Sequence, residues 1–78
     1  MKQRVHARHR VLKAGTIEFG GGAIDCTVRN MSVGGAALDV ISPLGIPERF
    51  LLVIRADEFS KSARMVWHKE NRIGIVFE

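Results

Sequence analysis

Short runs of aliphatic and β-branched residues, separated by clusters of Gly, Pro, Asn and Asp, follow one another along the chain. The segment AIDCTVRN at 23–30 alternates strictly, which places Ile24, Cys26 and Val28 on one face of a strand and polar residues on the other. A period of two is typical of a sheet with one wet face. The runs predict six strands, at residues 11–19, 23–30, 36–41, 49–55, 61–68 and 72–77.

Turn-forming residues lie between these runs. GGG at 20–22 and KENR at 69–72 each suit a tight hairpin, whereas SPLGIP at 42–47 suits a crossing loop because two prolines and a glycine break regular structure. ADEFSKSA at 56–63 is interpreted as a loop with one turn. Short antiparallel strands in this number commonly close into a barrel, which removes exposed strand edges. We therefore expect an all-β fold, a small six-stranded antiparallel β-barrel without a long helix.

The composition is that of one small soluble domain. With 78 residues, 46% hydrophobic and 26% charged, the chain has room for a single core and is not of the disordered class. The longest apolar run, FLLVI at 50–54, is too short to cross a bilayer, and no apolar stretch follows the basic start as a signal peptide requires. Cys26 is the only cysteine, so no internal disulfide forms. We expect a cytoplasmic protein with no membrane insertion.

The positive charge is concentrated at the start of the chain. Residues 1–17 contain five basic and no acidic residues, giving +5, and the other 7 basic and 8 acidic residues give −1, for a net charge of +4. Such a segment suits an anionic partner, although a solvated basic tail has the same composition. We expect the chain to divide into a basic arm at 1–10, a candidate ligand-binding segment, and a barrel at 11–78.

Two arginines of the arm, Arg4 and Arg8, stand four positions apart. The planar guanidinium donates paired hydrogen bonds to phosphate oxygens or to O6 and N7 of guanine, and its flat face stacks on a base. A ligand that has both phosphates and bases is therefore well matched by arginine. Taken alone, this spacing arises easily by chance in basic sequence.

A second motif, RNMSVGGAAL at 29–38, lies between two predicted strands. The amide of Asn30 and the hydroxyl of Ser32 can match the mixed donor and acceptor edge of a nucleobase. Gly34 and Gly35 allow positive φ and a close approach of the backbone to a neighbour. The same residue types also build ordinary β-turns, and that reading remains open for the motif in isolation.

The two motifs together, Arg-x-x-x-Arg followed by Asn-x-Ser-x-x-Gly in a small β-rich domain, resemble the PilZ family of cyclic di-GMP receptors. The resemblance runs from the arm to the closing segment RIGIVFE. It implies a barrel with the arm wrapped over its surface near the second motif. It also implies a non-enzymatic receptor that orders its arm on binding and signals to a protein partner. The implied ligand-binding residues are Arg4, Arg8, Asn30, Ser32 and Gly35, with Arg10 and Lys13 as electrostatic support only.

Many PilZ domains continue into a C-terminal helix, whereas this chain stops at Glu78. The barrel end that such a helix covers would then be open, closed by homo-oligomerisation, or docked by a partner. The resemblance does not choose among these three.

Other chemistries find less support. His6, His9 and His68 with Cys26 lack the spacing of metal ligands, so we expect no metal and no cofactor besides the ligand. No nucleophile motif surrounds Ser32, so enzyme activity is not expected. Trp67, the sole tryptophan, is interpreted as core or edge packing rather than as a stacking platform, although its fluorescence would report binding if it lay near the arm.

Two further functions stay open at this point. A small basic barrel binding single-stranded nucleic acid or RNA is the main alternative, and no DNA partner is expected. Four Phe and one Trp, mostly at core-like positions, provide few stacking surfaces for it. A barrel that has lost its ligand and only scaffolds a complex is disfavoured by the intact motif residues.

Overall fold

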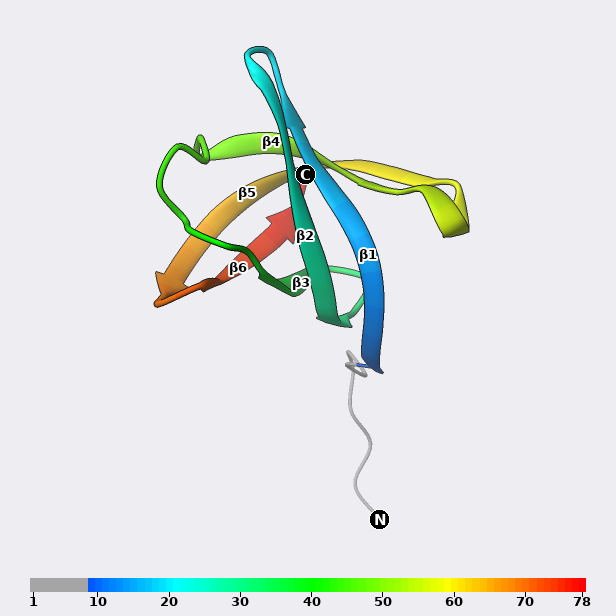
Figure 1. Cartoon of the computed structure of the whole chain (residues 1–78). Helices are drawn as coiled ribbons and strands as arrows, with labels where there is room; N and C mark the ends of the chain where they lie inside the picture. The colour runs from blue at the N-terminus through cyan, green and yellow to red at the C-terminus, as the bar shows by residue number, and fades with distance from the viewer. Residues whose placement is uncertain (1–8) are drawn as a thin grey trace.

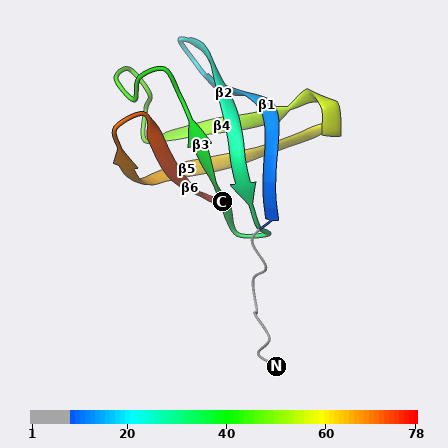
Figure 2. The ribbon, with the colours of Figure 1, turned by 60° about the horizontal axis from the view of Figure 1, so that its bottom comes forward.

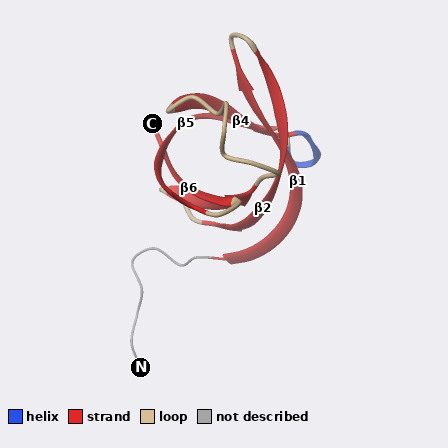
Figure 3. Ribbon diagram, turned by 60° about the vertical axis from the view of Figure 1, so that its left-hand side comes forward, coloured by secondary structure: helices blue, strands red, loops and turns tan. Residues whose placement is uncertain are grey.

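Residues 9–78, the part of the chain that the computed structural model describes, form six antiparallel strands that close into a barrel in the order β1-β2-β3-β6-β5-β4 (Figure 3). The predicted all-β fold and barrel are confirmed. The strands are β1 (His9–Phe19), β2 (Gly22–Met31), β3 (Gly35–Asp39), β4 (Arg49–Ile54), β5 (Phe59–Lys69) and β6 (Arg72–Phe77), with one 3-10 turn, η1, at Arg55–Asp57. In residues 9–78 no helix is long and apolar enough to span a membrane.

Most strand boundaries agree with the sequence prediction to within two residues. β1 begins two residues earlier than predicted, and β5 begins at Phe59, so the segment 56–63 contains the expected single turn but continues as strand. β3 ends at Asp39, two residues earlier than predicted. The N–H of Val40 donates to the carbonyl of Asn71 at 2.8 Å, and the chain then leaves the sheet, which explains why Ile41 is 88% exposed.

Two hairpins project beyond the barrel (Figures 1 and 2). The β1–β2 hairpin turns at Gly20 and Gly21, as the GGG segment predicted, and the β4–β5 hairpin turns through η1. The predicted hairpin between β5 and β6 is also confirmed, with Glu70 in the left-handed region at φ 56°. The segment 40–48 is the expected crossing loop between β3 and β4.

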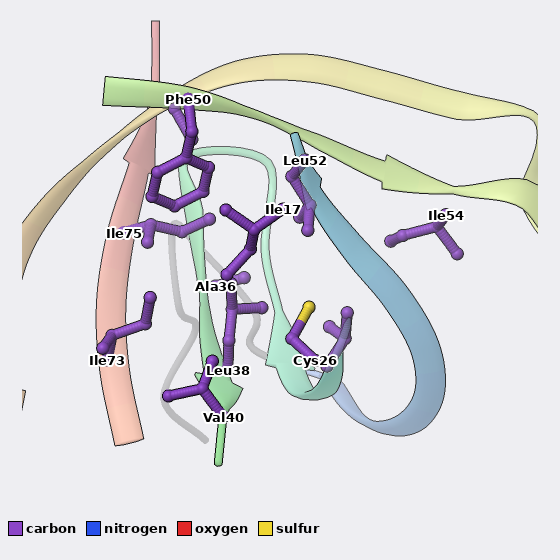
Figure 4. Close-up of a cluster of buried hydrophobic side chains, with 12 residues drawn as sticks. Ile17, Cys26, Ala36, Leu38, Val40, Phe50, Leu52, Ile54, Ile73 and Ile75 are labelled. Carbon is purple, nitrogen blue, oxygen red and sulfur yellow. The ribbon is translucent and has the colours of Figure 1, made fainter. Parts of the chain in front are cut away.

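The core fills the barrel interior (Figure 4). Cys26 lies there with its strand neighbour Val28, so the alternation in β2 correctly predicted the inward face. Complete burial of an aliphatic side chain stabilises the fold by about 1.5–3 kcal/mol. The largest fully buried side chains are Ile17, Val28, Leu38, Leu52, Ile54 and Ile73.

The barrel closes between β1 and β4 through a short seam. Only three residue pairs join these strands, from Thr16–Val53 to Glu18–Leu51. The central pair, Ile17 with Leu52, is completely buried and anchors the seam in the core.

Candidate functional site

The predicted motif residues Asn30, Ser32 and Gly35 lie at the turn from β2 to β3. Ser32 closes this turn, because its backbone N–H donates to the carbonyl of Gly35 at 2.8 Å and its hydroxyl accepts from the N–H of Gly34 at 3.3 Å. The motif residues therefore do form a turn, as one of the two interpretations from the sequence predicted. The turn also holds the polar motif residues at one end of the barrel.

The chain enters the barrel beside this motif. The backbone of His9 is paired with Met31, and the backbone of Arg10 is paired with Asn30. The arm is therefore continuous with the strand that borders the motif. Arg4 and Arg8 lie outside the described residues.

Gly35 is required by a close approach of β3 to β6. A Cβ built at this position would lie closer than 3.0 Å to the carbonyl oxygen of Ile75, a distance that real Cβ atoms essentially never show. The backbone of Gly35 is extended, and its φ is not in the left-handed region. The expected close approach is confirmed at Gly35, whereas a positive φ is not used there.

Three β-bulges surround the motif. One lies in the β1–β2 pairing between Arg10 and Lys13, and a second lies in the β2–β3 pairing at Arg29, directly before Asn30. The third lies in the β5–β6 pairing at Val66. Bulges re-aim side chains and are over-represented beside functional sites. The bulges at Arg29 and Val66 directly precede Asn30 and Trp67 in their strands and so alter the direction of these side chains.

A row of cross-strand partners runs across four strands at this place. Asn30 pairs with Ala37, Ala37 pairs with Gly74, and Gly74 pairs with Trp67. Residues directly opposite in a sheet point to the same face. Since neighbouring strands are about 4.8 Å apart, Asn30 and Trp67 are separated by roughly 14 Å across a floor of small residues.

Trp67 forms the far end of this row. Its ring lies over Gly74, where an added Cβ would come closer than 3.0 Å to three ring atoms, and the residue is still 46% exposed. Trp67 therefore lies neither in the core nor at a sheet edge, the two positions interpreted from the sequence, but on the outer face of β5, where it packs on Gly74 and presents an indole to solvent. A groove of about 280 Å³ joins it to Ser32 and Gly35 of the motif but is not lined by Asn30; its lining residues are Ser32, Gly34, Gly35, Ala36, Val66, Trp67, Gly74, Ile75 and Val76.

The sequence contains a signal for the position of Trp67, and that signal is a glycine in another strand rather than the tryptophan itself. In RIGIVF the inward residues Ile73 and Ile75 leave Gly74 on the outer face. A glycine within a strand indicates that another group approaches the backbone closely. Here that group is the indole.

Lys13 is not brought to this groove. Its ammonium forms an ion pair with Asp57 of η1, and both residues line a different groove of about 690 Å³ beside the β1–β4 seam. Within residues 9–78 no three His, Cys, Asp or Glu side chains are placed to hold a metal ion.

Comparison with known proteins bears on the arm and the barrel together. The family model described as PilZ domain matches residues 2–78, which includes both arginines of the arm, the β2–β3 turn and the strand that carries Gly74. No curated protein matches the chain.

Proposed function

Because the chain belongs to the PilZ domain family, whose members are receptors for cyclic di-GMP and not enzymes, we propose that it binds cyclic di-GMP in the groove between the β2–β3 turn and Trp67. One observation carries the proposal. The groove unites Ser32 and Gly35 with an exposed indole, and the strand that continues the arm begins beside it.

The ligand and the residues match in chemistry. Cyclic di-GMP has two phosphates and two guanines, so a receptor without a metal needs cations that also recognise purines. Arg4 and Arg8 bind phosphate oxygens and the edge or face of guanine. The amide of Asn30 and the hydroxyl of Ser32 meet the guanine edge that holds both donors and acceptors.

Trp67 adds a stacking surface to this set. Stacking of a base on an aromatic side chain contributes about 1–3 kcal/mol. The small residues Ala37 and Gly74, which lie between Asn30 and Trp67 in the cross-strand row, let the indole pack close to the sheet while part of the tryptophan stays exposed. The groove thus provides a wall for stacking and a polar end for recognition.

Binding orders the arm, and the ordered arm changes the surface that a protein partner meets. An arm that becomes ordered on binding loses conformational entropy, which lowers the affinity for a given set of contacts. The protein thereby acts as a non-enzymatic receptor and adaptor with two states, one with the arm loose and one with it clamped.

Isothermal titration calorimetry tests the proposal. Cyclic di-GMP, GTP and a short single-stranded oligonucleotide are titrated into the wild type and into Arg8→Ala. We expect saturable binding of cyclic di-GMP alone, weakened about ten- to a hundred-fold in the variant, because a hydrogen bond to a charged group contributes about 1.5–3 kcal/mol. Absence of cyclic di-GMP binding would refute the proposal, and oligonucleotide binding would then favour a nucleic-acid protein.

A further inference from the structure

A second groove lies on the other side of Trp67. It has a volume of about 610 Å³ and is lined by Asp39, Trp67, Lys69, Glu70, Asn71 and Arg72. Trp67 is the residue that it shares with the groove of the β2–β3 turn. The indole therefore separates two open spaces, and the second is the larger one.

Both grooves open on the same face of the sheet. Asp39 pairs with Arg72, and Arg72 pairs with Lys69, which makes a second row of cross-strand partners. Each of these residues stands two positions from its counterpart in the row of Trp67, so both rows face outward, about 7 Å apart. One ligand with two bases can therefore reach across the indole.

The walls of the second groove are held in place. The guanidinium of Arg72 donates to Asp39 at 2.7 Å through Nε and at 3.5 Å through a terminal nitrogen, and this pairing raises the pKa of Arg72. Arg29 approaches the same carboxylate at 3.5 Å. The bond from Val40 N–H to the Asn71 carbonyl, 2.8 Å long, ties the β5–β6 turn to the end of β3.

This groove is lined by two carboxylates, Asp39, which is paired, and Glu70, whose acceptors are unused. Within residues 9–78 its carboxylate makes no hydrogen bond or ion pair, and it is exposed at the turn. A carboxylate accepts two parallel hydrogen bonds. Guanine presents two neighbouring donors, N1–H and N2–H, on one edge, and adenine does not. Lys69, at the same end of the groove, can donate to the acceptor O6 beside them.

We propose that the second groove binds the second guanine of cyclic di-GMP, with Glu70 accepting from N1–H and N2–H while the base lies against Trp67. This inference rests on the proposed function. It assigns one guanine to the β2–β3 turn and the other to the β5–β6 turn. Trp67 stands between them as a wall common to both.

Glu70→Gln tests the inference, because it keeps the shape of the side chain and removes the charge. Its matched control is Glu58→Gln, since Glu58 is also an exposed glutamate of a hairpin turn in the left-handed region, at φ 51° against 56° for Glu70. We expect Glu70→Gln to bind cyclic di-GMP about ten-fold or more weakly than the wild type, and Glu58→Gln to bind like the wild type. Thermal unfolding verifies that both variants fold.

A mixed ligand sharpens the test. Cyclic GMP–AMP can place its guanine at the β2–β3 turn and must then place adenine against Glu70. We expect the wild type to prefer cyclic di-GMP over cyclic GMP–AMP by about ten-fold or more, and Glu70→Gln to lose most of this preference. Calorimetric stoichiometry identifies the source of the guanine. One ligand per chain supports a bridging ligand, and a change from two to one in the variant supports a guanine from a second molecule in the same groove.

The experiment separates a failure of this inference from a failure of the proposed function. Wild-type binding of cyclic di-GMP with equal affinity in Glu70→Gln would overturn the inference and leave the proposed function intact. No binding in the wild type would overturn both.

Discussion

The indole of Trp67 occupies the space above Gly74 that any other residue would fill with its own side chain. The two residues are direct partners in the β5–β6 ladder, next to the bulge at Val66. The glycine is thus the reason that the tryptophan lies flat against the sheet between two grooves rather than upright in solvent. This pair links the regular sheet to the candidate ligand surface.

Gly74→Ala should displace the indole without unfolding the barrel. The new Cβ would meet atoms of the Trp67 side chain and not the backbone, so the ring can move away. We expect a red shift of tryptophan fluorescence and a weaker affinity for cyclic di-GMP. Gly20→Ala is the control, because nothing lies within 4 Å of a Cβ at position 20. Unchanged emission and affinity in Gly74→Ala would show that the ring does not depend on this glycine.

Gly35→Ala should destabilise the whole fold. Its Cβ would meet the carbonyl of Ile75, a backbone atom that cannot rotate away, so β3 and β6 must separate. Overpacking of this kind costs about 1–3 kcal/mol or more. Urea denaturation measures the loss. Gly21→Ala, at an open position, should change the free energy of unfolding far less. Equal midpoints for the two variants would contradict the close approach.

Asp57→Asn should have little effect on ligand affinity. It removes the partner of Lys13, and both side chains of this ion pair are more than a third exposed, at 41% and 38%. Exposed pairs contribute about 0–1 kcal/mol, so the loss of stability should be small and should shrink further in high salt. Lys13→Ala should also keep its affinity for cyclic di-GMP. A ten-fold loss of affinity in Lys13→Ala would show that this lysine does contribute to ligand binding.

The stability of the protein should fall in alkaline solution because of Cys26. Burial, and secondarily the charge of Asp25, raises the pKa of this thiol from 9.0 to about 11. The unfolded chain therefore releases the proton at a lower pH than the folded protein, and the free energy of unfolding decreases as the pH rises from about 9 to about 11. The loss approaches about 2–3 kcal/mol.

Chemical denaturation at several pH values measures this effect, with Cys26→Ala as the reference. Other groups also titrate in alkali, so the informative quantity is the difference between the two proteins. That difference should narrow by pH 11. A constant difference from pH 7 to pH 11 would mean that the thiol titrates alike in the folded and unfolded states.

The sequence predicted the strands better than their pairing. Alternation in 23–30 and the turn residues at 20–22 and 69–72 are local signals, and each was confirmed. The bulges at Arg29 and Val66 carry no comparable local mark, because they arise from how neighbouring strands align. Secondary structure is largely encoded in short segments here, whereas register depends on the closed barrel.

In the candidate site, too, residues marked by local sequence were predicted, and a residue placed by strand pairing was not. Asn30, Ser32 and Gly35 were identified because they are close in sequence and fit a motif. Trp67 was interpreted as packing alone, since its neighbours in the chain give no hint that it faces the β2–β3 turn. The partner that decides its position, Gly74, stands seven residues further along and across a hairpin.

Because the row from Asn30 to Trp67 depends on strand register, the candidate site is sensitive to insertions in some segments and not in others. One residue inserted in β6 would exchange inward and outward positions and move the glycine from beneath the indole, and one inserted in β3 would replace Ala37 in the row. Residues added to the loop at 40–48 would leave every partner of the row unchanged. Insertions and deletions in this protein are therefore judged by their place, and this loop is where evolution or an engineer has room to lengthen the chain.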